Sequence, residues 1–146
     1  IPAPAFNKIK LKNMKNDIEL IPKKNKINFI WNSNFPINSL YIMRGYLFVE
    51  ENKKNKYLET FFNAYWQDDI DLNIEDNIIQ LLNNLSIDHK QFFKSIGEQE
   101  IKDELKNLTH EAFEREIFGA PTFVVNNKIF WGQDRLEYAI DELTSN

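Results

Sequence analysis

The sequence of 146 residues contains no cysteine. This absence excludes structural disulfides and any Cys-x-x-Cys redox chemistry within these residues. No apolar run approaches the roughly 20 residues that span a bilayer, and no signal peptide pattern is present. We therefore expect a soluble protein of the cytoplasm that has no membrane partner.

An excess of basic residues is also lacking, because 22 acidic side chains outnumber 18 basic ones and the formal net charge is −4. A nucleic-acid partner requires a basic face that neutralises phosphates, so we expect none. The two histidines, His89 and His110, have no Cys, Asp or second His at ligand spacing. Asp68, Asp69 and Asp71 lack the glycine and the bidentate Glu of a calcium loop. We therefore predict no metal site.

Apolar residues are plentiful, at 42% of the sequence with 14% aromatic, so the chain can bury a core and fits one domain. Apolar spacing predicts helices over most of the chain. The first helix is expected over about 7–20, with an end at Ile21-Pro22, and the second begins after Ser39. The third ends at Trp66. Two more begin after caps at Asn73 and Asp88, and the last one before the hairpin covers 98–117. In the helix that ends at Trp66, Leu58, Phe61, Phe62 and Tyr65 recur at i, i+3, i+4 and i+7 and predict its buried face.

The C-terminal part predicts a β-hairpin followed by a helix. Two short apolar runs, 123–125 and 129–131, flank Asn126-Asn127, a pair that tolerates the positive φ angles of a tight turn. Pro121 suits the start of the first strand, where its missing N–H costs no ladder bond, and its peptide bond is either cis or trans. Beyond Gly132, apolar spacing predicts a helix that begins near Gln133 or Asp134.

The beginning of that last helix is a candidate anion site, because a helix N-terminus presents free N–H donors and the positive end of the dipole. Asp134 either caps the helix, which would satisfy those donors, or takes part in ligand binding. Arg135 has the planar guanidinium that pairs with carboxylates, or is simply solvated.

The residues at 119–122, Gly-Ala-Pro-Thr, and at 130–136, Phe-Trp-Gly-Gln-Asp-Arg-Leu, carry a resemblance. Together they resemble the C-terminal signature of the 2-hydroxychromene-2-carboxylate isomerases, which belong with the kappa-class glutathione transferases to the DsbA-like branch of the thioredoxin fold. The resemblance implies an α+β, DsbA-like thioredoxin fold that lacks its first β-α-β portion. It also implies one domain over 1–146, with a helical insertion over about 7–117 and the thioredoxin-fold hairpin and helix over 118–146.

The resemblance assigns a glutathione site to four residues. Pro121 would be the cis-proline of the fold, and Ala120 before it would offer backbone groups to the cysteinyl part of glutathione. Asp134 and Arg135 would hold the γ-glutamyl end. Arg44 occupies the position of a family arginine, and it either reaches a ligand carboxylate or forms a buried ion pair.

The family's catalytic serine lies in a segment that precedes the part matched here, and the chain opens with Ile1 instead of Met, so we expect a missing upstream segment. We assign no catalytic residue. The serines of this chain lie in other elements: Ser33, Ser39, Ser86, Ser95 and Ser145. A two-stranded hairpin is marginal alone, so these residues belong to a longer chain, or a second copy or a local rearrangement covers its edge; among these we expect a homodimer.

Three functions remain open. The first is a glutathione-dependent isomerase or transferase acting on a small aromatic or otherwise hydrophobic electrophile, as the resemblance implies. The second is a degenerate, non-catalytic relative that binds a thiol or only assembles with a partner. The third is a DsbA-like thiol oxidoreductase whose cysteines lie upstream.

Overall fold

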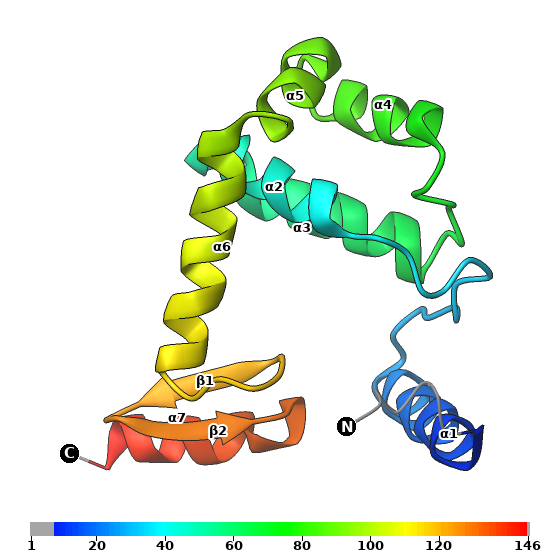
Figure 1. The fold of residues 1–146 in the computed structure, drawn as a ribbon. Helices are drawn as coiled ribbons and strands as arrows, with labels where there is room; N and C mark the ends of the chain where they lie inside the picture. The colour runs from blue at the N-terminus through cyan, green and yellow to red at the C-terminus, as the bar shows by residue number, and fades with distance from the viewer. Residues whose placement is uncertain (1–7, 146) are drawn as a thin grey trace. The chain divides into compact units, whose positions relative to one another are not determined.

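The computed structural model describes residues 8–145, which divide into two compact units between Ile96 and Gly97. The fold is mostly helical with one antiparallel pair of strands (Figure 1). In chain order the elements are α1 (Lys8–Asn25), α2 (Leu40–Phe48), α3 (Glu51–Trp66), α4 (Glu75–Asn84), α5 (His89–Ile96), α6 (Gln99–Glu114), β1 (Thr122–Val125), β2 (Lys128–Trp131), the 3-10 turn η2 (Gln133–Arg135) and α7 (Leu136–Thr144). None of the helices in residues 8–145 has the length and hydrophobicity that crossing a membrane requires. The extended lead-in expected at residues 1–6 lies outside the described residues.

The core of the first unit forms where α2, α3, α4 and α5 meet. Its most deeply buried side chains are at most 1% exposed and include Tyr57, Leu72, Leu82 and Phe92. Gly45 lets α2 approach this core closely, because a Cβ at that position would collide with the Phe92 ring and the Tyr57 hydroxyl. Burial of these large side chains is the main source of this unit's stability.

The predicted buried face of α3 is partly wrong. Phe61 and Tyr65 are buried as expected, whereas Leu58 is 37% exposed and Phe62 is 59% exposed. Tyr57, which the spacing did not single out, is fully buried instead. The reason is that α3 carries apolar residues on more than one side, so that periodicity alone does not decide which side meets the core.

Two helix boundaries also differ from the sequence-based expectation. α1 continues through Pro22 and ends at Asn25, where the carbonyls of its last turn accept hydrogen bonds from groups that follow them in the chain. The Asn25 amide donates to the Ile21 carbonyl at 2.9 Å, and the Ile27 N–H donates to the Pro22 carbonyl at 2.9 Å. Similarly, α6 ends at Glu114 and does not continue to Ile117. Glu116 has a φ of +59°, which is outside the range of a right-handed helix.

One of the two predicted helix caps is confirmed. The Asp88 carboxylate accepts hydrogen bonds from the N–H groups of Lys90 and Gln91, at 2.8 and 3.0 Å, at the start of α5. These bonds, chiefly the one from Gln91, lower the pKa of Asp88. Asn73 is not a cap, because α4 begins after Ile74 and the Asn73 amide turns back to the carboxylate of Asp71.

The second unit contains the predicted hairpin. β1 pairs with β2 in an antiparallel register that runs from Thr122 opposite Trp131 to Val125 opposite Lys128. Asn126 and Asn127 form the turn with φ angles of +50° and +60°, as predicted. Figure 1 shows α7 lying along the hairpin, and α7 packs mainly against β1. Within the described residues the sheet has these two strands only.

Candidate functional site

Four predicted glutathione-site residues lie on the two segments that join at the end of the hairpin opposite its turn. One segment, Ala120-Pro121, enters β1, and the other, Gly132–Arg135, leaves β2. The Gly132 N–H donates to the Pro121 carbonyl at 2.9 Å, so the two segments are bonded directly. The Ala120-Pro121 peptide bond is cis. The hairpin therefore brings together residues that are separated by about a dozen positions in the sequence.

The loop before Pro121 is held by the side chains of Phe118, Thr122 and Trp131. The Trp131 indole lies directly against Gly119, where a Cβ would collide with its ring nitrogen. The Phe118 ring lies 5.2 Å from the Trp131 ring, between centroids, and the Thr122 hydroxyl donates to the Gly119 carbonyl. Gly119 is therefore required by close packing against Trp131.

Ala120 is an exposed residue at this place. Within the described residues, neither its N–H nor its C=O takes part in a hydrogen bond. A backbone N–H and C=O that face solvent can bind an extended peptide in the manner of an added strand. Ala120 thus has the free groups that binding the backbone of a peptide-like ligand would require.

Asp134 and Arg135 form an exposed ion pair beside this segment. The distance from the Asp134 Oδ2 to the Arg135 Nη1 is 3.0 Å, and the side chains are 63% and 51% exposed. Asp134 makes no capping hydrogen bond, so the alternative in which it caps the last helix is wrong. The physical reason is that the 3-10 turn η2 precedes α7, with Gly132 at a φ of +104° allowing the sharp entry.

The pair presents one charge of each sign to solvent, and the Arg135 guanidinium also lies 5.6 Å from the Tyr138 ring. Such a pair contributes little to stability when exposed, because water screens it. It is, however, complementary to a zwitterion such as the α-amino and α-carboxylate groups of an amino acid. The site therefore suits a ligand that ends in such a group.

Arg44 lies in α2 of the first unit. Its Nε is buried without a hydrogen-bond partner, and it forms no ion pair with any residue in the described part of the chain. The buried ion pair that the sequence left open is therefore not formed there. Its alternative role, contact with a ligand carboxylate, stays a prediction.

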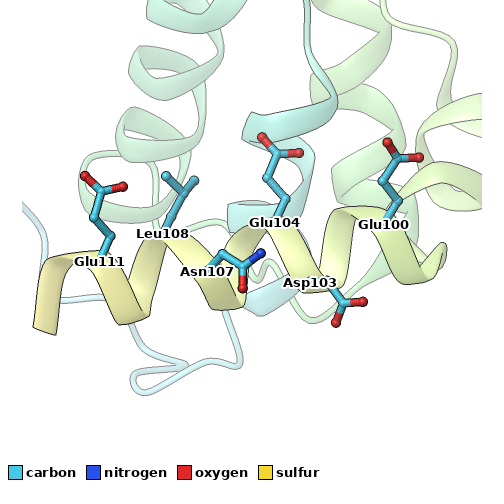
Figure 2. Close-up of a pocket in the computed structure, with 6 residues that line it drawn as sticks. All are labelled: Glu100, Asp103, Glu104, Asn107, Leu108 and Glu111. Atoms are coloured by element: carbon cyan, nitrogen blue, oxygen red, sulfur yellow. The ribbon is translucent and has the colours of Figure 1, made fainter. Parts of the chain in front are cut away.

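A concave surface of about 600 Å³ lies along α6. Figure 2 shows side chains spreading from this one helix, with Asp103 directed away from Glu100 and Glu104. Within residues 8–145 no group of three or more His, Cys, Asp or Glu side chains could hold a metal ion. The apolar spacing within 98–117 predicts an inward row at Ile101, Leu105, Leu108 and Ala112, but no side chain of α6 is buried. This surface therefore offers carboxylates without convergent geometry.

Comparison with known proteins gives consistent results. The family described as DSBA-like thioredoxin domain matches residues 1–144. The chain is 27% identical over 136 residues to a 2-hydroxychromene-2-carboxylate isomerase of Pseudomonas putida, which covers 92% of this chain and 66% of that protein. It is 28% identical over 129 residues to a protein of the same name from Pseudomonas sp. (strain C18), with coverage of 88% and 60%.

A solved structure is also similar to this chain. It is a selenomethionine form of 2-hydroxychromene-2-carboxylate isomerase (HCCA isomerase), with a TM-score of 0.86 and 26% sequence identity. The similarity covers 98% of this chain and 71% of that chain. The sequence thus spans only 60–66% of the length of the two curated Pseudomonas relatives.

Proposed function

This chain belongs to the DsbA-like thioredoxin domain family, and on that premise we propose that it acts as a glutathione-dependent isomerase or transferase of the 2-hydroxychromene-2-carboxylate isomerase type. The names of its relatives support an isomerase of this type. Its proposed substrate is a small aromatic or otherwise hydrophobic electrophile.

One observation carries the glutathione part of the proposal. The hydrogen bond from the Gly132 N–H to the Pro121 carbonyl joins the segment that carries Ala120 to the segment that carries Asp134 and Arg135. A tripeptide with a thiol in the middle and an amino-acid zwitterion at one end needs both a strand-like backbone partner and a pair of opposite charges. These are the two kinds of group that this end of the hairpin offers.

The residues would divide the binding as follows. The free N–H and C=O of Ala120 would bind the backbone of the cysteinyl residue, as in strand addition. The Asp134 carboxylate would accept hydrogen bonds from the ligand's ammonium group, and Arg135 would donate to its carboxylate. Glutathione, when bound, supplies the thiol that adds to the unsaturated substrate and leaves again. We propose no serine of this chain as catalytic.

Titration calorimetry of the 146-residue chain with glutathione tests the proposal. We expect Asp134→Ala to weaken binding by about 10-fold or more, because a hydrogen bond to a charged group is worth about 1.5–3 kcal/mol. The matched control is Glu137→Ala, which removes an exposed carboxylate three residues further on, in the first turn of α7.

Equal binding by wild type, Asp134→Ala and Glu137→Ala would remove Asp134 from the site. If both variants weakened binding equally, the effect would be one of net charge alone. Either result would contradict the proposed role of the Asp134–Arg135 pair.

A further inference from the structure

The two residues that flank Ala120 are both held by the end of β2. Gly119 packs against the Trp131 indole, and the Pro121 carbonyl accepts a hydrogen bond from the Gly132 N–H at 2.9 Å. Trp131 and Gly132 are consecutive, so one short piece of chain contacts both neighbours of Ala120. Ala120 itself is exposed, and within the described residues its N–H and C=O have no hydrogen-bond partner. Its backbone is therefore fixed through its neighbours and not through bonds of its own.

The contact between Trp131 and Gly119 is tight. A Cβ atom at position 119 would lie 2.5 Å from the indole Nε1 and 3.2 Å from two carbons of the indole ring. At such distances either the indole or the chain would have to move. The φ angle of Gly119 is not positive. The requirement for glycine at this position therefore comes from the indole beside it and not from a left-handed backbone conformation.

Two further contacts fix the peptide unit between Gly119 and Ala120. Thr122 lies opposite Trp131 in the sheet register, and its hydroxyl donates to the Gly119 carbonyl. The Phe118 ring lies 5.2 Å from the indole, between centroids. The Gly119 C=O and the Ala120 N–H belong to the same planar peptide group. Contacts that hold Gly119 therefore also set the direction of the Ala120 N–H.

Trp131 is not a core residue of the second unit, because its side chain is 54% exposed. Hydrophobic stabilisation scales with the apolar area removed from water, so a half-exposed indole contributes less to stability than a buried one. Replacing it with a small residue removes the contact with Gly119 without opening a cavity inside a core. An effect on ligand binding can therefore be separated from an effect on folding at this position.

From these contacts we propose that Trp131 is a positioning residue. Its indole holds Gly119 and, through the shared peptide group, orients the Ala120 N–H towards a peptide-like ligand. This role rests on the proposed function for the identity of the ligand, glutathione, and adds the residue that prepares its backbone partner. A backbone that is fixed before binding costs no further ordering when the ligand arrives. The role requires no contact between Trp131 and the ligand.

Titration calorimetry of the 146-residue chain with glutathione tests this role in Trp131→Ala. We expect binding to weaken about 5–30-fold, because the backbone of one more residue must be ordered at the moment of binding. Trp131→Phe keeps an aromatic ring at this position and should recover most of the lost affinity. The matched control is Phe113→Ala, which likewise removes an aromatic ring from the second unit, at a position in α6 that is 73% exposed. It should leave the affinity unchanged.

A double-mutant cycle shows whether the effect passes through Gly119. Gly119→Ala alone should also weaken glutathione binding, because the added methyl group displaces the indole. In the Trp131→Ala background the methyl group has free space, so Gly119→Ala should weaken binding much less there. Relaxation of ¹⁵N nuclei in the ligand-free chain gives a second readout that a general loss of stability would not produce. The Ala120 amide should be more mobile in Trp131→Ala than in wild type, and the amides of α7 should stay unchanged.

Equal glutathione binding by wild type and Trp131→Ala would overturn the positioning role and leave the proposed function standing. Additive effects of the two substitutions, or an Ala120 amide with unchanged mobility, would overturn the role as well. If Trp131→Ala did not fold, Gly119→Ala would decide, because it keeps the indole but moves it, and wild-type affinity there would contradict the role. If wild type bound no glutathione, the proposed function would fail and this inference with it.

Discussion

Gly45 and its neighbours show how single residues set the packing of the first unit. α2 meets the core through a glycine, and the space that a methyl group would need is filled by the Phe92 ring and the Tyr57 hydroxyl. Both neighbours are fully buried at 0% exposure, so neither can move aside easily. Glycine is required at this position because there is no room for a Cβ atom. Its backbone conformation does not require glycine, because its φ angle is not positive.

We expect Gly45→Ala to destabilise the protein by about 1–3 kcal/mol, the usual cost of overpacking a core. Alanine has the higher helix propensity, by about 1 kcal/mol. A stabilised variant would therefore show that helix propensity dominates, and a destabilised variant that core packing does. Urea denaturation measures it. Asn55→Ala, at an exposed position in the interior of α3, is the control and should be neutral or slightly stabilising. A stabilised Gly45→Ala variant would contradict the close contact.

The residue scale also shows why sequence predicted some positions and not others. Asp88 and Asn126 were predicted correctly because a cap and a hairpin turn depend on the few residues around them. Leu58 and Phe62 were assigned to the core wrongly, because burial depends on which elements pack against a helix. The Tyr65 hydroxyl is buried without a hydrogen-bond partner. The sequence did not predict this, because a buried tyrosine hydroxyl normally finds a hydrogen-bond partner.

At the scale of elements, the hairpin and α7 are held together near the turn by one carboxylate. Glu142 of α7 accepts hydrogen bonds from the Lys128 ammonium at 2.8 Å and from the Asn126 amide at 3.3 Å. The bond from Lys128, followed by that from Asn126, lowers the pKa of Glu142 below its ordinary value of 4.5. The ionised form is therefore preferred in the folded state, and its contribution depends on pH.

Because the folded-state pKa is the lower one, this stabilisation is fully present above about pH 4.5 and is lost as the pH falls through the folded-state pKa. We expect Glu142→Gln to unfold at a lower temperature than wild type at pH 7, and the difference to shrink towards zero as both are acidified below pH 4.5. Thermal unfolding followed by circular dichroism checks this. Glu137→Gln, an exposed carboxylate on the same helix, is the control. A difference that persists unchanged in acid would contradict the ion pair.

Element boundaries were less predictable than element types. The sequence predicted the helices, the hairpin and the terminal helix, but it ended α1 at Pro22 and extended α6 to Ile117. Both errors arise at helix ends, where a few hydrogen bonds to the last carbonyls decide the boundary. The entry to α7 shows the same limit, because the η2 turn displaces Asp134 from the cap position that its residue type favours.

At the scale of the whole molecule, the family and the fold were predictable because residues 119–136 carry both the hairpin and the candidate site. An apolar pocket of the first unit was not predictable. It is lined by side chains from α2, α3 and the segment 35–39, which come together only in the folded chain. Several apolar residues of the second unit are exposed, among them Phe118, Trp131 and Leu143 at 72%, 54% and 64%. The expected homodimer, which would cover such a surface, stays a prediction that size-exclusion chromatography tests.

The most direct test of the central claim is a map of the glutathione contacts by ¹⁵N NMR on the 146-residue chain. We expect the largest shifts at the amides of Ala120, Gly132, Asp134 and Arg135, which flank the hydrogen bond between Gly132 and Pro121. Shifts confined to other elements, or none at saturating glutathione, would contradict the claim that this end of the hairpin holds the thiol.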